Sequence, residues 1–341
     1  MEREPIGVDL ALQGGGSHGA FTWGVLDRFL EESWLQIEGV SGTSGGAMNA
    51  AVLADGFAAG GAAGARKALE SYWRSVSDAA RFSPFQRSPV DKMLGRWSLD
   101  NAPSFLFMDF MTRLMSPYQF NPLGGNALAP ILTSQIHFER LRTSPIKVFI
   151  TATNVRTGLP RVFRNADLTP QALMASACLP TLFQAVEIDG ESYWDGGYSG
   201  NPTFAPLVNE TRSDDAILVP VNPLERIGTP KTPTEILNRL NEVSFNSVAV
   251  KELHMMEVLR RHSHELTGDT EASAWARMRV HVVRNSIMDT LGFASKLNTE
   301  WDFLSMLKQE GRKAADQFLR DEGARIGVSP TVDFEQLLAM L

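Results

Sequence analysis

The chain has 341 residues, of which 43% are hydrophobic and 21% are charged. This is enough apolar material for a large folded core and too much for an intrinsically disordered chain. The net charge of −7 argues against broad nucleic-acid binding, which needs a basic surface, and against electrostatic capture by anionic lipid.

The single cysteine, Cys178, excludes an intramolecular disulfide framework and fits a reducing compartment. The first residues lack the charged-then-apolar layout of a secretory signal, and no run of about 18 apolar residues predicts a transmembrane helix. We therefore expect a cytoplasmic protein, with no nucleic-acid partner and with at most a transient, mainly apolar contact with a membrane surface.

The first part of the chain repeats one pattern: a strand, a glycine cluster and a helix. Strands are predicted at residues 8–13 and 36–41, a helix at 18–32, and a further helix from Ser44. Such a repeat implies parallel strands joined by helical crossovers. Later strands are expected at 147–153, 161–164, 185–189 and 216–221.

The C-terminal part follows a Pro/Gly-rich link at residues 222–233 and is mostly helical. Apolar residues recur there at helical spacing, and one strand and one more helix are expected at 278–284 and 298–320. The recurring residues are Ile236, Leu240, Val243, Leu253, Met256 and Leu259. We predict a three-layer α/β/α sandwich with a mainly parallel central sheet over residues 7–222, and a helix-rich extension over 223–341 packed on it.

The first glycine cluster spans Gly14–Gly19, between a predicted strand and a predicted helix. Glycines there let main-chain N–H groups point into one small space beside a helix N-terminus, which makes an anion site. Two chemistries use such a site: an oxyanion hole, or pyrophosphate binding, since Gly14-x-Gly16-x-x-Gly19 also fits the dinucleotide-binding pattern. A purely structural tight turn is the third interpretation.

The second strand ends in Gly42-Thr-Ser44-Gly-Gly46 rather than in the acidic residue that a dinucleotide site needs, because Glu38 lies inside that strand. The Gly-x-Ser-x-Gly layout between a strand and a helix is typical of a nucleophile elbow, with Ser44 as nucleophile. In isolation, a helix N-cap with glycines in a loop would be the commoner role for Ser44. Two glycine turns at successive strand ends, however, would lie side by side on one edge of the sheet, where ligands bind.

No histidine is a convincing partner for Ser44. Those on the C-terminal helices lie among charged residues, His281 alternates with apolar neighbours, and His18 lies within the glycine loop. A carboxylate is the better candidate: Tyr193-Trp194-Asp195-Gly196-Gly197 places Asp195 at a strand end before two glycines. Asp-Gly is also a common hairpin signal.

In order along the chain, Gly14–Gly19, Gly42–Gly46 and Asp195–Gly197 closely resemble the three signatures of the patatin-like phospholipase family. The segment Ala175–Pro180 is also similar to a family segment that leads to the aspartate. The resemblance covers about residues 7–205 and implies a Ser44–Asp195 dyad, in which Asp195 accepts the serine proton without a histidine. It implies neither a cofactor nor a metal. The expected oxyanion donors are Gly14, Gly15, Gly16, Ser17, Gly19 and Gly45, and the expected supporting residues are Gly42, Gly46, Gly196, Gly197 and His18.

The family usually has Lys or Arg where this chain has His18. We therefore expect a titratable charge beside the oxyanion loop, so that His18→Arg would flatten the pH profile between about 5.5 and 7.5.

Residues 101–126 are unusually rich in Phe and Met. They are either a lid or acyl groove that contacts a membrane or micelle, or ordinary core beneath an insertion.

The resemblance implies a lipid acyl hydrolase of the phospholipase A or lysophospholipase type, with a lipid or acyl ester as substrate. An esterase for short-chain or polyhydroxyalkanoate esters would use the same dyad. A nucleotide-binding or non-catalytic scaffold is the alternative from another class.

Overall fold

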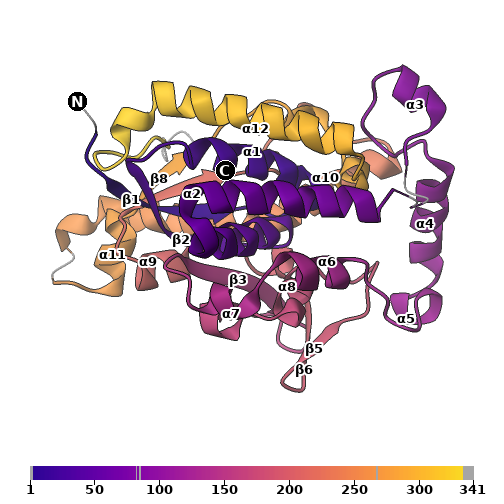
Figure 1. The fold of residues 1–341 in the computed structure, drawn as a ribbon, viewed down its shortest axis with the longest axis horizontal. Coiled ribbons are helices and arrows are strands. Elements are labelled where there is room, and N and C mark those ends of the chain that lie inside the picture. Colours follow the sequence, from indigo (N-terminus) through magenta and orange to yellow (C-terminus); the bar gives the residue numbers. More distant parts are fainter. Residues whose placement is uncertain (1–2, 82, 84–85, 266–267, 333–341) are drawn as a thin grey trace.

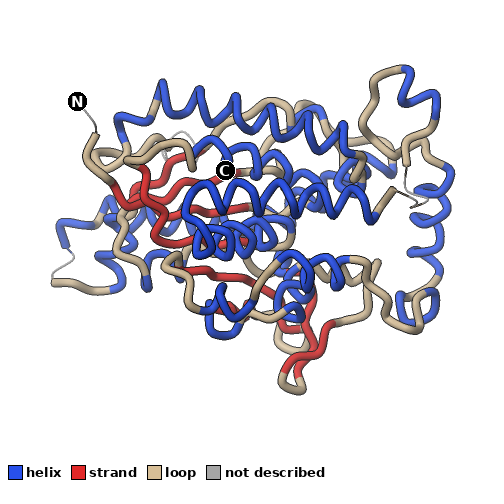
Figure 2. The backbone as a smooth tube through the Cα atoms, in the orientation of Figure 1, coloured by secondary structure: helices blue, strands red, loops and turns tan. Residues whose placement is uncertain are grey.

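The computed structural model describes residues 3–81, 83, 86–265 and 268–332. An eight-stranded sheet forms its centre, with the strand order β5-β6-β3-β2-β1-β7-β8 and with β4 paired to β3. The strands are β1 (Ile6–Leu12), β2 (Leu35–Gly42), β3 (Lys147–Asn154), β4 (Pro160–Arg164), β5 (Val186–Ile188), β6 (Glu191–Asp195), β7 (Asp215–Val219) and β8 (Arg279–Val282). Figure 2 shows most of the strands between helices, whereas the β5–β6 hairpin, labelled in Figure 1, projects from the lower edge of the view.

The sheet is mainly parallel. The pairs β1–β2, β1–β7, β2–β3 and β7–β8 are parallel, whereas the three pairs that involve β4, β5 and β6 are antiparallel. The carboxyl ends of β1 and β2 meet at one edge, because Leu12 is in register with Gly42. The two glycine clusters that follow these strands are therefore neighbours, as the sequence predicts.

Helices cover both faces of the sheet (Figure 1). They are α1 (Gly19–Phe29), α2 (Gly45–Ala79), α3 (Pro89–Met93), α4 (Pro103–Leu114), α5 (Pro117–Phe120), α6 (Leu128–Gln135), α7 (Phe138–Arg142), α8 (Pro170–Ser176), α9 (Ala205–Glu210), α10 (Pro233–Arg261), α11 (Glu271–Arg277) and α12 (Trp301–Asp321). The short 3₁₀ helices are η1 (Gly16–His18), η2 (Asn165–Asp167), η3 (Gly196–Tyr198), η4 (Ser263–Glu265), η5 (Met288–Thr290), η6 (Phe293–Leu297) and η7 (Gly323–Arg325).

The alternation of side chains along β1 separates the two hydrophobic cores. Val8, Leu10 and Leu12 face the core that contains α1, α2 and α12. Ala11 faces the other core, which contains residues of α9, α10 and α11. The predicted three-layer α/β/α sandwich with a mainly parallel sheet is confirmed.

The Ala/Gly-rich stretch after Ser44 folds into a helical hairpin. The backbone of α2 leaves helical geometry at Gly60 and Gly61, and Gly61 has φ +60°, which favours glycine. The two halves then pack closely, since a Cβ at Gly56 would lie 2.9 Å from the carbonyl oxygen of Gly64. Small residues in this stretch therefore serve a close helix–helix contact.

The C-terminal part shares the sheet and the core with the N-terminal part. Strand β8 pairs with β7 in parallel, and α12 packs on α1. That helix contact is close, because a Cβ at Gly24 would lie 2.0 Å from the carbonyl oxygen of Lys308, and a Cβ at Gly311 would lie 2.0 Å from that of Phe21. The two predicted helical stretches after residue 233 form the single helix α10.

Helix α4 stands apart from the main body, across one end of α2 (Figure 1). It contains no buried residue, and Phe107 and Phe110 are 66% and 57% exposed. Ordinary core, one of the two interpretations of residues 101–126, is therefore wrong for α4. No described helix is both long and apolar enough to cross a bilayer.

Candidate active site

Ser44 occupies a strained turn between β2 and α2. Its φ of 53° and ψ of −121° are uncommon for a residue other than glycine. The turn is held in place by contacts: the Ser44 amide donates to Ser176 Oγ at 2.9 Å, and the Gly46 amide donates to the Thr43 carbonyl at 2.8 Å. This is the geometry that a nucleophile elbow requires.

The glycines around Ser44 are needed for close approach. A Cβ at Gly46 would lie 2.2 Å from the Leu12 carbonyl oxygen, and one at Gly42 would lie 2.6 Å from that of Gly46. A Cβ at Gly14 would lie 2.7 Å from the Ser44 Cβ. The first glycine cluster and the serine turn are therefore in direct contact.

Asp195 ends β6 and is fully buried. Its Oδ1 accepts a hydrogen bond from the Gly197 amide at 2.7 Å. Its Oδ2 is buried and has no hydrogen-bond partner in the described part of the chain. Burial raises the pKa of Asp195 to about 7, against opposing contributions from the Gly197 amide, the Ser44 hydroxyl and Lys296.

Ser44 and Asp195 line one cavity, although they are 151 positions apart in sequence. The Ser44 hydroxyl is near enough to lower the pKa of Asp195 but does not reach hydrogen-bond geometry with Oδ2. A buried carboxylate with a free oxygen beside a serine hydroxyl can accept a proton from it, and catalytic hydrogen bonds often tighten only when substrate binds.

The glycine loop presents fewer free amides than the sequence suggests. Gly15, Gly16, Ser17 and Gly45 line the cavity. The Gly14 amide instead donates to Asn201 Oδ1 at 2.6 Å, and the Gly19 amide donates to the carbonyls of Gly16 and Ser17. Because those two N–H groups already have acceptors, the prediction that Gly14 and Gly19 are oxyanion donors is wrong. These two glycines shape the loop instead.

A buried network of amide side chains holds the glycine loop. Gln13 Nε2 donates to Asn246 Oδ1 at 2.9 Å, and Gln13 Oε1 accepts from the backbone amides of Val221 and Asn222 at 3.0 Å. Asn222 Nδ2 donates to the Gly14 carbonyl at 2.8 Å. Sequence reasoning missed these residues, although Asn222 follows β7 at the sheet edge where the other turns lie.

His18 is buried rather than exposed to the site. Its Nε2 lies 2.8 Å from Ser295 Oγ, and burial, with Lys296 nearby, lowers its pKa to about 3. His18 is therefore neutral above about pH 4, and the expected titration between pH 5.5 and 7.5 is wrong. The sequence could not indicate this, because the segment that covers His18 lies 277 residues further along the chain.

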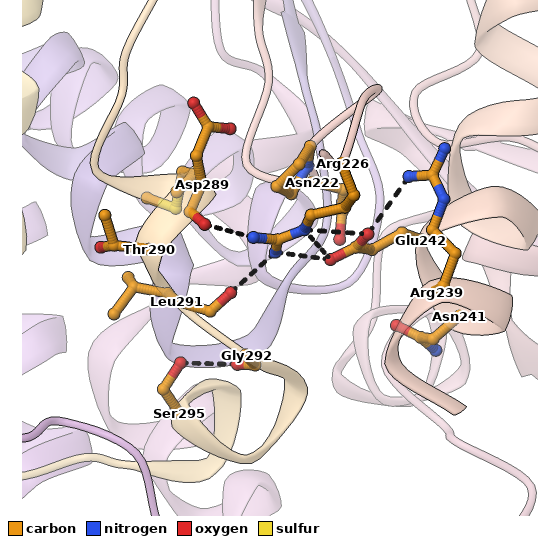
Figure 3. Close-up of polar contacts among 12 residues, drawn as sticks. Asn222, Arg226, Arg239, Asn241, Glu242, Asp289, Thr290, Leu291, Gly292 and Ser295 are labelled. Atoms are coloured by element: carbon orange, nitrogen blue, oxygen red, sulfur yellow. Dashed lines mark hydrogen bonds and ion pairs between the residues drawn. The ribbon is translucent and has the colours of Figure 1, made fainter. Parts of the chain in front are cut away.

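Hydrogen bonds of Arg226 connect three C-terminal segments of the chain (Figure 3). The Arg226 guanidinium donates to the Glu242 carboxylate on α10 at 2.7 Å and to the Leu291 carbonyl at 2.9 Å, and it also contacts the Asp289 carbonyl. It thereby joins the link after β7 to α10 and to the segment that leads into η6.

The cavity has a volume of about 710 Å³ and is mostly apolar. Its walls include Met48, Trp73, Phe120, Leu182, Phe245 and Phe293. Asp195 and Lys296 are the two charged residues among the described residues that line it. In the same described ranges, no cluster of three or more His, Cys, Asp or Glu side chains could hold a metal ion.

One of three comparisons with known proteins identifies a family. The family model described as "Patatin-like phospholipase" matches residues 10–208, more than half of the chain, and this range contains Ser44 and Asp195. A similar solved structure is described as "Crystal structure of VipD from Legionella pneumophila"; it has 14% sequence identity and a TM-score of 0.34, over 90% of this chain and 67% of that chain. A comparison with curated proteins finds no match.

Proposed function

Because the chain belongs to the patatin-like phospholipase family, whose members act on lipid esters as acyl hydrolases, we propose that it is a serine lipid acyl hydrolase with a Ser44–Asp195 dyad. The observation that carries this proposal is the shared cavity: Asp195, with its unpartnered Oδ2, and Ser44, on a strained elbow, line the same cavity, and the serine hydroxyl lowers the pKa of the carboxyl. The reaction is cleavage of a carboxylic ester through an acyl-enzyme.

Acylation moves the serine proton to Asp195 and replaces the bond between the acyl carbon and the alcohol oxygen with a bond to Ser44 Oγ. Asp195 Oδ2 accepts the proton of Ser44 Oγ while Oγ bonds to the ester carbonyl carbon. The carbonyl oxygen takes the negative charge, and amides of Gly15, Gly16 and Gly45 are the candidates to stabilise it. When the carbon–oxygen bond to the alcohol breaks, Asp195 returns the proton to the departing alkoxide.

Deacylation repeats the exchange with water. Asp195 accepts a proton from water as the hydroxide oxygen bonds to the acyl carbon, the bond to Ser44 Oγ breaks, and the proton returns to Oγ. A carboxyl with the usual pKa near 3.8 would be a weak base at neutral pH, whereas burial raises the pKa of Asp195 to about 7, near the working pH.

The apolar wall of the cavity supports a substrate with a long acyl chain. Its volume of about 710 Å³ lies within the usual range for ligand pockets and exceeds what a short ester needs. Met108 and Phe120, from the Phe/Met-rich segment, are among its lining residues. This favours a lipid acyl hydrolase over a short-chain or polyhydroxyalkanoate esterase.

The exposed apolar side chains of helix α4 support transient contact of this helix with a lipid surface. Met108 faces the cavity, whereas Leu106, Phe107 and Phe110 of the same helix are exposed. A helix with one side on the acyl pocket and apolar side chains on the other side can contact a membrane or micelle without spanning it.

The dyad is tested with Ser44→Ala and Asp195→Asn, purified beside wild type and checked for folding by circular dichroism. We expect both variants to lose kcat on phospholipid and p-nitrophenyl esters by about 10³-fold or more. A fluorophosphonate probe should label wild type and not Ser44→Ala. Full ester hydrolysis by a clean Ser44→Ala preparation would end the assignment, and absence of labelling in wild type would favour a non-catalytic scaffold.

A further inference from the structure

Lys296 is a cation in an otherwise apolar cavity that has one other charged residue, Asp195, among its described lining residues. An ammonium group in such a place is costly unless it is hydrogen-bonded or paired. Lys296 belongs to η6, in the C-terminal part, outside the residues that the family model matches. The motifs that identify the dyad therefore say nothing about this lysine.

Neutral groups hold the Lys296 ammonium in place. Nζ donates to Asn222 Oδ1 at 2.7 Å and to Asn241 Oδ1 at 3.0 Å. Two phenyl rings flank it, with Nζ 5.7 Å from the Phe245 ring centre and 5.6 Å from that of Phe293. Across the described ranges, no carboxylate lies within 4.0 Å of Nζ to neutralise it. The positive charge therefore remains available to the cavity.

The segment that carries Lys296 rests directly on the glycine loop. Gly16 has φ +56°, and a Cβ there would lie 2.5 Å from the Lys296 carbonyl oxygen. His18, in the same loop, contacts Ser295 at 2.8 Å and is neutral at working pH because of its lowered pKa. Position 18 thus supplies no charge to this loop, whereas Lys296 lies beside it.

We propose that Lys296 is the positioning residue that supplies the positive charge of the active site, favouring the ionised form of Asp195 and the negative oxygen that forms at the glycine loop. This inference rests on the proposed ester hydrolysis. The charges of the two residues act on each other: Lys296 lowers the pKa of Asp195, and Asp195 raises the pKa of Lys296. The net effect of burial is to lower the pKa of Lys296 to about 8, which still leaves it mostly charged at neutral pH.

The other titratable groups around the pair are accounted for. Cys178 and Tyr198 interact with Asp195, but burial raises the pKa of each to about 12, so both are neutral at working pH. Glu242 and Arg226 act on Lys296 with opposite signs and are paired with each other. His18 is neutral, as described above.

The test compares Lys296→Met, which removes the charge, with Lys296→Arg, which keeps it, and with Lys313→Met, which removes an exposed charge on α12. The substrates are a p-nitrophenyl ester, which has no phosphate, and a lysophospholipid of the same chain length. For Lys296→Met we expect kcat to fall about 10- to 100-fold on both substrates, less than for loss of a direct oxyanion donor. KM should change less than about twofold, by the same reasoning.

The pH profile separates this role from a merely structural one. Removal of the cation should move the acid limb of kcat/KM to higher pH, because Lys296 lowers the pKa of Asp195. Lys296→Arg should restore part of kcat and move the limb back, and Lys313→Met should behave as wild type. If Lys296→Met does not fold, Asn241→Leu, which removes one anchor of the ammonium, should give a smaller shift in the same direction.

Three results would overturn the inference. The first is a Lys296→Met variant whose kcat and acid limb are both unchanged. The second is a loss of kcat on the lysophospholipid alone, which would make Lys296 a phosphate-binding residue. The third is a rise in KM with kcat unchanged. The proposed function is judged separately on wild type and Ser44→Ala. An inactive wild type would refute both proposals, whereas an active wild type with an equally active Lys296→Met would refute only the role of Lys296.

Discussion

Lowering the pH from 7 to 5 should protonate Asp195 and thereby switch off ester hydrolysis. The base must be ionised to accept the serine proton, and burial raises the pKa of Asp195 from 3.8 to about 7. A single group with this pKa is about half ionised at pH 7, about 9% at pH 6 and about 1% at pH 5. We therefore expect kcat/KM to fall about fivefold from pH 7 to 6 and about tenfold more to pH 5.

The assay is initial-rate hydrolysis of a p-nitrophenyl ester, with product read after all samples are brought to one common pH. Circular dichroism at each pH, and recovery of activity on return to pH 7, separate protonation from unfolding. His18→Gln serves as the matched control, because the pKa of His18 is about 3 and lies outside the window. A flat profile from pH 7 to 5 would refute the reasoning, and loss of the acid limb in His18→Gln would assign it to the histidine instead.

Three further predictions concern other parts of the molecule. Gly24→Ala should cost about 1–3 kcal/mol of unfolding free energy in urea titration, because its Cβ would lie 2.0 Å from a carbonyl oxygen of α12; Gly323→Ala, whose nearest neighbour would be 4.0 Å away, should be close to neutral. Burial raises the pKa of Asp9 from 3.8 to about 8, so between these pH values Asp9 ionises in the unfolded chain but stays protonated in the folded protein. The free energy of unfolding therefore falls as pH rises. Asp9→Asn should therefore gain stability relative to wild type by up to about 1.4 kcal/mol per pH unit between pH 5 and 8; a constant difference would contradict this. Phe107→Asp, at an exposed position on α4, should impair hydrolysis of long-chain lipid far more than hydrolysis of short p-nitrophenyl esters. Leu159→Asp, at an exposed position outside the cavity lining, should affect neither activity. Equal loss of both activities in Phe107→Asp would argue for a role of Phe107 in stability.

The sheet edge and its turns were predictable because their signals are local. A short apolar strand followed by glycines predicts both the strand and the close approach after it, and the parallel repeat places Gly14 beside Ser44. Asp195 was predictable for the same reason, as a carboxylate at a strand end before two glycines. The predicted strands at 8–13, 36–41 and 147–153 correspond to β1, β2 and β3.

The surroundings of the site were not predictable because they come from tertiary packing. Lys296, Asn241 and Ser295 lie in the C-terminal helices and match no motif, and only the folded chain brings them to the glycine loop. The charge on His18 was wrongly expected for the same reason, because ionisation depends on what covers the ring. The helical spacing of apolar residues likewise predicts that Leu240 lies on a helix, but it does not predict that the Leu240 side chain is 57% exposed.

The side chains that brace the glycine loop, Gln13, Asn201, Asn222 and Asn246, are all primary amides, and none of them gains or loses a proton across the range in which enzymes work. The hydrogen bonds that they make with one another and with the backbone of the loop keep the same donors and acceptors in acid and in base. The frame of the catalytic centre is thus chemically inert to pH while the groups inside it ionise. A change of rate with acidity should therefore report the charge state of the reacting groups, with the shape of the loop held constant.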